Sequence, residues 1–278
     1  INFDDKVLLL GAAVEPERCR PGEVLEMTLY WQALEDLTAD YAVTLQAFGR
    51  DGARIGQRDS FTGQGNYPTS EWSPGEVVVD TYRVPIDPAA EAPVAAEVEV
   101  GLYVPDPRER LPAFDEQRRP LGRTTVARFK LAPRRKPRYE WVNPVDYRLG
   151  ERIVLRGYDV EGALRPGGAV RLTLYWEALD AVERDYTVFV HLLDEAGRVR
   201  AQQDGQPVRG EYPTGLWEEG ELIADRHEIT LPDNLAPGRY SAALGMYALE
   251  TMQRLPVFDG EGVRQPEDRI LLPLGRVR

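Results

Sequence analysis

The sequence predicts an all-β protein made of two tandem antiparallel β-sandwich domains, each immunoglobulin-like or jelly-roll, that arose by internal duplication. Three observations carry this prediction. Apolar and polar residues alternate along many short segments, and turn signals of the Pro-Gly and Asp-Gly type separate those segments. A long stretch of the chain also repeats itself at a fixed spacing. No segment shows a sustained helical period.

The repeat is the strongest of these signals. Residues 20–80 align with residues 165–225 without a gap, and about 23 of the 61 positions are identical. Beyond residue 80 the offset changes from 145 to 144, so that Gly101-Leu102-Tyr103 aligns with Gly245-Met246-Tyr247. Identity over so long a stretch predicts the duplication of a whole domain rather than a solenoid of short units.

The domain boundaries follow from the repeat. We expect a first sandwich at residues 1–132, a basic proline-rich linker at 133–141, and a second sandwich at 142–278. The run from Pro133 to Arg138 holds two prolines and four cations, whereas each flanking region has a net charge of about −8. We interpret the run as a stiff connector whose cations lie against acidic domain surfaces, with a nuclear-import or heparin-binding patch as the alternative.

Strands are predicted where the apolar period is two. Val170, Leu172, Leu174 and Trp176 share one face of a segment whose other face carries polar residues and Tyr175. Two further segments alternate in the same way, with these residues facing inward: Val98, Val100, Leu102 and Val104; and Tyr186, Val188, Val190 and Leu192. Periodicity does not give strand order, so the immunoglobulin-like and jelly-roll alternatives both stay open at this point.

Composition excludes several classes of function. The 278 residues have a formal net charge of −12, which disfavours binding to nucleic acid or to anionic lipid. No run is long and apolar enough to span a membrane, so we expect no membrane insertion by these residues. The single cysteine excludes an intrachain disulfide. Motifs for a serine nucleophile, a bound phosphate or a dinucleotide are lacking, so we expect no enzyme activity and no cofactor.

The candidate site is the loop Tyr-Pro-Thr-x-x-Trp, which occurs in both copies beside a polar stretch. Aromatic faces that stack on sugar rings, next to Asp and Gln that bond hydroxyls, are what a carbohydrate site requires. The alternative is that each Trp closes one end of its sandwich and each Asp holds a long loop. The candidate ligand-binding residues are Tyr212, Trp217, Asp204, Gln206, Tyr67, Trp72 and Asp59.

Other chemistry-bearing residues give weaker signals. His191 is expected to be structural, and His227, near the start of a strand, to be exposed; the two form no zinc signature. Cys19 is expected in a loop where adjacent arginines could lower its pKa. The acidic pairs Asp4-Asp5 and Glu218-Glu219 could hold a structural calcium ion, although no EF-hand spacing is present. Acidic residues are too numerous for any pair to indicate a glycosidase.

One region resembles a known family. The run Asp185–Asp194, followed by Gln202–Pro207 and Tyr212-Pro213-Thr214, resembles the β-sandwich module that follows the transmembrane part of some bacterial membrane glycosyltransferases of the dolichyl-phosphate-mannose mannosyltransferase-like type. The first copy departs from this pattern at Thr44–Phe48 and lacks the Gly205-Gln206-Pro207 turn. The family has no established activity or catalytic residue to transfer onto these positions.

The resemblance implies a non-catalytic accessory region of an extracytoplasmic, cell-envelope protein. Such a region would bind or position a glycan or the parent glycosyltransferase, and would be tethered through sequence outside these residues. Because the chain begins with Ile rather than Met, we expect a processed product or a piece of a longer protein. A purely structural spacer and, less favoured, a glycoside hydrolase are the alternatives.

Overall fold

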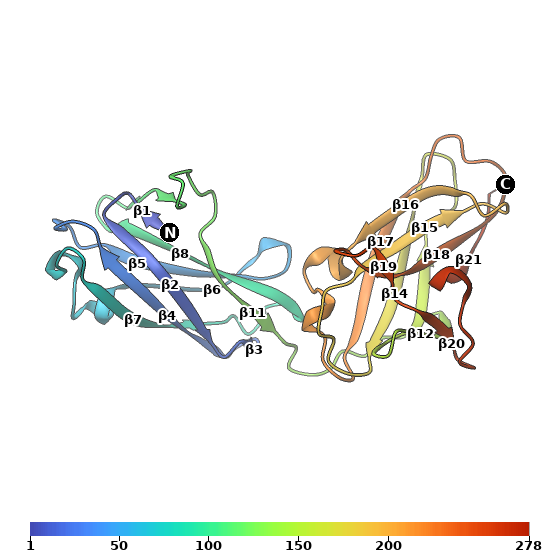
Figure 1. Cartoon of the computed structure of the whole chain (residues 1–278), viewed down its shortest axis with the longest axis horizontal. Coiled ribbons are helices and arrows are strands. Elements are labelled where there is room, and N and C mark those ends of the chain that lie inside the picture. The colour runs from blue at the N-terminus through green and yellow to red at the C-terminus, as the bar shows by residue number, and fades with distance from the viewer. Residues whose placement is uncertain (278) are drawn as a thin grey trace. The chain divides into compact units, whose positions relative to one another are not determined.

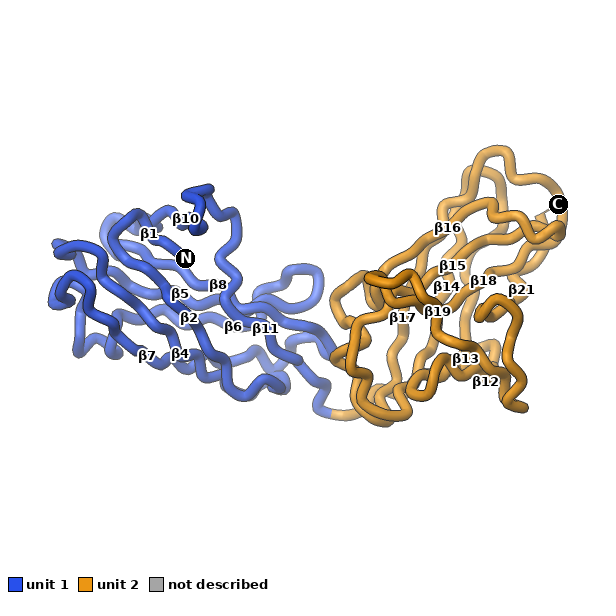
Figure 2. The backbone as a smooth tube through the Cα atoms, in the orientation of Figure 1, with its two compact units in different colours: residues 1–134 blue, residues 135–278 orange. Residues whose placement is uncertain are grey.

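The computed structural model describes residues 1–277, which form β-strands and short 3₁₀ helices with no α-helix among them. The all-β prediction is confirmed. The chain divides into two compact units, residues 1–134 and 135–278, and each consists of two facing sheets (Figures 1 and 2). No helix in the described range is long and apolar enough to cross a membrane.

Unit 1 contains eleven strands. They are β1 (Asn2–Phe3), β2 (Val7–Glu15), β3 (Arg18–Cys19), β4 (Val24–Ala33), β5 (Ala42–Phe48), β6 (Arg54–Phe61), β7 (Val77–Pro85), β8 (Val94–Val104), β9 (Glu109–Arg110), β10 (Ala113–Phe114) and β11 (Thr125–Leu131). Its 3₁₀ helices are η1 (Arg50–Gly52), η2 (Thr62–Gly65) and η3 (Thr69–Glu71).

Residues 135–277 of unit 2 form the other ten strands. They are β12 (Asn143–Leu149), β13 (Ile153–Glu161), β14 (Ala169–Ala178), β15 (Thr187–Leu193), β16 (Val199–Gly205), β17 (Leu222–Thr230), β18 (Gly238–Ala248), β19 (Gln253–Arg254), β20 (Val257–Asp259) and β21 (Ile270–Val277). Its 3₁₀ helices are η4 (Pro207–Gly210), η5 (Thr214–Leu216) and η6 (Pro266–Asp268).

The order of the main strands is the same in both units. In unit 1 the first sheet contains β2-β4-β7 and the second contains β11-β8-β5-β6; the corresponding strands of unit 2 are β13-β14-β17 and β21-β18-β15-β16. Seven main strands, with the first, second and fifth in one sheet and the other four in the second, form an immunoglobulin-like sandwich. A jelly roll would need eight main strands in two Greek keys.

Each sandwich encloses its own apolar core. The inward faces predicted from alternation are buried: Val170, Leu172, Leu174 and Trp176 of β14 are at most 1% exposed, and Val188, Val190 and Leu192 of β15 are fully covered. These residues belong to one hydrophobic cluster in unit 2, and a separate cluster fills unit 1. Val104 is only half-buried and packs at the margin of the core.

Tyr175 departs from the simple alternation of β14. It lies on the outward face, yet it is only 8% exposed, because residues that precede β12 fold back over it. The rings of Tyr139 and Trp141 lie 5.5 and 5.6 Å from the Tyr175 ring. Tyr175 also donates a hydrogen bond of 2.7 Å to the Asp159 carboxylate. Part of the segment expected as a linker is therefore packed against unit 2.

We predict a stability change in alkaline solution from this buried phenol. Burial, with the neighbouring Asp159 carboxylate as a second cause, raises the pKa of Tyr175 to about 12. The folded state therefore holds the phenolic proton more tightly than the unfolded chain, whose tyrosines titrate near pH 10. The contribution is complete below pH 10 and is lost as the pH rises from about 10 towards 12. Difference titration of ultraviolet absorbance against Tyr175→Phe should show this group; a midpoint near pH 10 would contradict the prediction.

Candidate functional site

The two tryptophans of the repeated loop are buried. Trp217 is 1% exposed and Trp72 is 3% exposed, and each belongs to the core of its unit. The indole nitrogen of Trp217 donates to the carbonyl of Tyr212 at 3.1 Å. A ring covered on both faces has no surface on which a sugar can stack. Their placement therefore favours the alternative in which each Trp closes the end of its sandwich.

The tyrosines of the same loop are held by glutamates that also recur in the repeat. Tyr212 is fully buried and its hydroxyl donates to Glu221 at 2.6 Å, while the same carboxylate accepts from the Glu218 amide. In unit 1 the half-buried Tyr67 donates to Glu76 at 2.7 Å. This bond raises the pKa of the Tyr67 phenol. Both hydroxyls thus have partners inside the protein.

The threonine of the loop joins it to the segment that enters the next sheet. Thr214 Oγ1 donates to the carbonyl of Arg184 and accepts from the amide of Tyr186, both at 2.8 Å. Thr69 makes the corresponding bonds to Ala39 and Tyr41 in unit 1, also at 2.8 Å. The repeated aspartates join in, because Asp185 accepts from the Gly215 amide at 2.9 Å and Asp40 accepts from the Ser70 amide at 3.2 Å. We call these bonds between side chains and loop backbone the clamps of each unit.

A buried polar network forms beneath this loop in unit 2. Asp225 is fully buried; its carboxylate accepts from the Val208 amide at 2.8 Å, lies 2.7 Å from His227 Nε2, and accepts from the Trp176 indole at 3.3 Å. Gln203 contacts the other ring nitrogen of His227. The expectation that His227 is exposed is wrong, since it is 3% exposed. The sequence carries a signal for this burial, because His227 lies on the same inward face of β17 as Asp225 and Ile229.

The backbone of the same loop is strained, and Asp225 stabilises it by accepting a hydrogen bond from the loop. Val208 and Arg209 have φ values of 53° and 57°, the left-handed region that non-glycine residues rarely adopt. In unit 1 the matching residues are Gly63 and Gln64, and Asp80 accepts from the Gly63 amide at 2.8 Å. The repeated aspartate therefore serves the loop in both units.

The remaining candidate residues lie in other surroundings. Asp204 is 3.3 Å from His191 Nε2 and accepts from the Tyr247 hydroxyl at 3.3 Å. Asp59 accepts from the Gln57 side chain at 2.7 Å and lies 3.5 Å from an Arg108 nitrogen. Half-buried Gln206 caps η4, where its carbonyl accepts from the amide of Gly210. Among the candidates, Tyr212 and Trp217 are brought into direct contact, whereas Asp204 faces a different group of side chains.

Two further expectations concern Cys19 and metal binding. Cys19 is fully buried in β3, and burial raises the pKa of its thiol, so the expected lowering by adjacent arginines is wrong. Within residues 1–277 no group of three or more His, Cys, Asp or Glu side chains is placed to hold a metal ion. Asp5 is instead paired with Arg118 at 2.5 Å, and Asp4 with Lys6.

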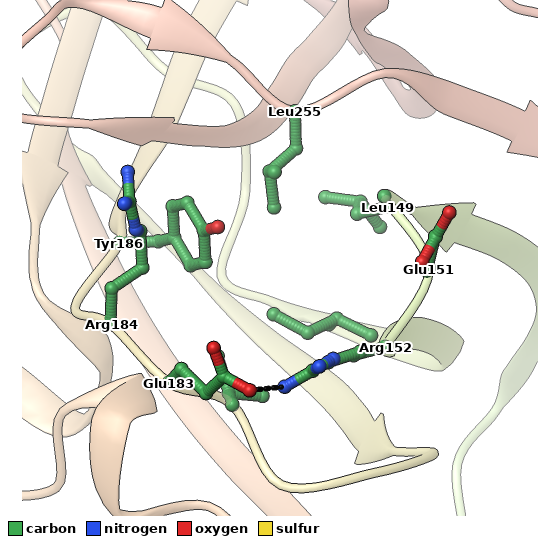
Figure 3. A pocket seen from close by; sticks show the side chains of 10 residues that line it. Leu149, Glu151, Arg152, Glu183, Arg184, Tyr186 and Leu255 are labelled. Carbon is green, nitrogen blue, oxygen red and sulfur yellow. Dashed lines mark hydrogen bonds and ion pairs between the residues drawn. The ribbon is translucent and has the colours of Figure 1, made fainter.

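Unit 2 has a pocket that the sequence motifs did not indicate. It has a volume of about 290 Å³ and lies where the β12–β13 turn, the β14–β15 loop and the segment after β19 meet. Figure 3 shows the ring of Tyr186 and the side chains of Leu149 and Leu255 on one side, with Arg152 and Glu183 on the other. Arg152 donates to Glu183 at 2.9 Å and to a loop carbonyl at 2.6 Å.

The pocket residues differ between the two units, unlike the clamps. Thr38 and Ala39 of unit 1 stand at the positions of Glu183 and Arg184. Phe3 pairs in register with Val7 and Ala113, as Leu149 does with Ile153 and Val257, so the larger Phe3 ring stands where Leu149 stands. Tyr41, the counterpart of the half-buried Tyr186, is only 6% exposed.

We expect Trp217→Ala to lower the free energy of unfolding of unit 2 by about 3–5 kcal/mol, the usual cost of truncating a buried tryptophan. Denaturant unfolding followed by circular dichroism measures this change. Trp72→Ala is the matched variant in unit 1 and should have a similar effect there. A Trp217→Ala chain with unchanged stability would contradict the structural role.

Asp225→Ala should cost about 3 kcal/mol or more, because it leaves the Val208 amide, the Trp176 indole and His227 without their acceptor, and each buried orphan costs roughly 1–3 kcal/mol. The matched variant Asp80→Ala removes the bond to the Gly63 amide and should cost less. Calorimetric unfolding of both variants gives the comparison. Equal losses, or none for Asp225→Ala, would refute the network's contribution.

No protein-family model and no curated protein match the sequence. Among solved structures, the chain is similar to the adhesin InvE of Yersinia pseudotuberculosis, with 13% identity and a TM-score of 0.26. The match covers 97% of this chain and 60% of the adhesin, so the chain spans less than two thirds of that protein. A likeness at this level carries no argument about function. None of these comparisons identifies a glycosyltransferase module, so that resemblance stays a prediction.

Proposed function

We propose that the chain is a non-catalytic accessory region of a cell-envelope protein, in which unit 2 binds a neutral, hydroxyl-rich ligand of the glycan class. The observation that carries this proposal is the pocket at Tyr186. Its lining differs from unit 1 at Leu149, where unit 1 has the larger Phe3, and at Glu183 and Arg184, where unit 1 has Thr38 and Ala39. Tyr212, Thr214 and Asp225, whose counterparts recur in unit 1, bond groups inside the protein and support the fold. Residues that open a pocket in one unit alone are better candidates for recognition.

The chemistry of the lining supports a neutral polyol. Tyr186, Leu149 and Leu255 give an apolar side against which the C–H face of a sugar can pack. Two carboxylates and two guanidinium groups, from Glu151, Glu183, Arg152 and Arg184, supply acceptors and donors for hydroxyl groups. These charges balance, so the lining favours neither a strongly anionic nor a strongly cationic ligand.

The volume limits the size of what is held. At about 290 Å³ the pocket is at the lower end of the range for small-molecule sites, which suits one sugar residue at the end or side of a longer glycan. Binding of this kind would position a glycan relative to a parent glycosyltransferase. The extracytoplasmic location belongs to the same proposal. A structural spacer is the alternative, and it requires no ligand.

A hydrolase in the same pocket has less support. Glu151 and Glu183 both line it, and a glycosidase uses two carboxyl groups. A general acid, however, needs a carboxyl group in apolar surroundings. The side chain of Glu183 is 79% exposed and paired with Arg152, which is a poor setting for that role.

We predict that a glycan array or affinity electrophoresis detects a ligand for the wild-type chain and that Tyr186→Ala weakens its binding about tenfold, a loss of roughly 1.4 kcal/mol. The matched variant Glu183→Thr/Arg184→Ala gives the pocket the residues of unit 1 and should also lose binding. Glu183 and Arg184 are exposed at the rim, so their exchange should hardly change the unfolding temperature. Tyr186 is half-buried against the core, so binding by Tyr186→Ala is compared at a temperature at which circular dichroism shows the variant to be folded.

A control separates recognition from folding. Thr38→Glu/Ala39→Arg makes the reverse exchange in unit 1, outside the pocket, and should leave glycan binding unchanged. Failure of the wild-type chain to bind any glycan would favour the spacer. Binding that survives Tyr186→Ala and the rim exchange would place the site elsewhere.

A further inference from the structure

The hydroxyl of Tyr186 points into the pocket of unit 2. Figure 3 shows it at the tip of the ring, directed towards the side chains of Leu149 and Leu255. Within residues 1–277 no other group forms a hydrogen bond with it. By contrast, the hydroxyls of Tyr212 and Tyr175 each donate to a carboxylate inside the protein. The Tyr186 hydroxyl is therefore available to a ligand.

The charged side chains of the pocket are less suited to selecting a ligand. Arg152 donates to Glu183 at 2.9 Å and to the Ala181 carbonyl at 2.6 Å, so this pair of charges is engaged in holding the β14–β15 loop. Glu151 and Arg184 are exposed to solvent. A hydrogen bond made in water discriminates weakly between ligands, because water replaces any partner that a ligand lacks.

The Tyr186 hydroxyl lies among apolar neighbours instead. Leu149 is 1% exposed and Leu255 is half-buried. A ligand that covers the hydroxyl removes it from water, so the ligand must supply the lost hydrogen bond or bind more weakly. A phenol hydroxyl both donates and accepts, as a sugar hydroxyl does. The two groups are therefore matched partners.

The counterpart of Tyr186 in unit 1 does not offer its hydroxyl in this way. Tyr41 is 6% exposed, and the ring of Phe3 stands where Leu149 stands in unit 2. The tyrosine recurs in both units, but the smaller Leu149 leaves space in front of it in unit 2 alone.

We propose that the Tyr186 hydroxyl is the specificity-determining group of the pocket. It exchanges a hydrogen bond with one hydroxyl of the bound sugar, so the pocket selects the sugar that carries this hydroxyl over the deoxy form that lacks it. The inference rests on the glycan binding proposed above and adds the substituent that is recognised. The ring packs against either form, so it contributes affinity without choosing between them.

The test uses the whole 278-residue chain with methyl glycosides of glucose, galactose and mannose, and each of their monodeoxy forms, as probes. Dissociation constants are measured by NMR titration. We expect the wild-type chain to bind its preferred glycoside about tenfold more tightly than one of the deoxy forms. Tyr186→Phe, which keeps the ring, should weaken the preferred glycoside by a similar factor and bind both forms alike.

Two control variants locate the effect. Tyr41→Phe makes the same substitution in unit 1 and should leave every dissociation constant unchanged. Leu149→Phe gives the pocket the residue of unit 1 and should abolish binding of all the probes. Calorimetry checks that each variant remains folded.

Two results would overturn the inference while glycan binding stands. The first is a Tyr186→Phe chain that binds as tightly as the wild type although Tyr186→Ala loses binding, since the ring alone would then act. The second is an equal preference for the intact glycoside over its deoxy form in wild type and Tyr186→Phe. A wild-type chain that binds neither these probes nor any arrayed glycan would overturn glycan binding itself, and the inference with it.

Discussion

The fold of each unit depends on clamps between side chains and loop backbone at the end of the sandwich. Sheets can pack face to face through apolar residues alone, but the long connections between them carry amides and carbonyls that must be bonded. Thr214 bonds the backbone at Arg184 and Tyr186, and Asp225 bonds the backbone at Val208. These bonds fix the entry of β15 and the path of the loop after β16.

The clamps explain why the two copies share particular residues. Thr214 and Tyr212 each bond a residue that recurs in the other unit. Asp225 bonds a backbone amide in a loop that has the same conformation in the other unit. Replacing one partner would leave a buried polar group unpaired, at a cost of roughly 1–3 kcal/mol. The repeated aromatic and polar residues therefore stabilise the fold of each unit. The bonds that these shared residues make are therefore common to both units.

Two differences between the units change the surface. In the first, smaller and charged residues around Tyr186 leave a pocket in unit 2, where unit 1 has Phe3 and a buried Tyr41. In the second, Trp141 lies over Gly157 beside Tyr175, which is 8% exposed, whereas Tyr30, the counterpart of Tyr175 in unit 1, is 40% exposed. The two units therefore differ at their surfaces, although the order of the main strands is the same.

The sequence by itself determined the all-β class and the inward faces of strands such as β14, because alternation with period two reports which side of a strand is buried. It did not determine strand order, which depends on pairings between distant segments and which the tertiary structure decided in favour of the immunoglobulin-like sandwich. Trp217 and Asp204 have the residue types of a sugar site, yet burial and partners decide what they do. The pocket at Tyr186 arises where separate segments meet, so no local pattern could predict it, whereas the burial of His227 follows the alternation of buried and exposed residues along β17.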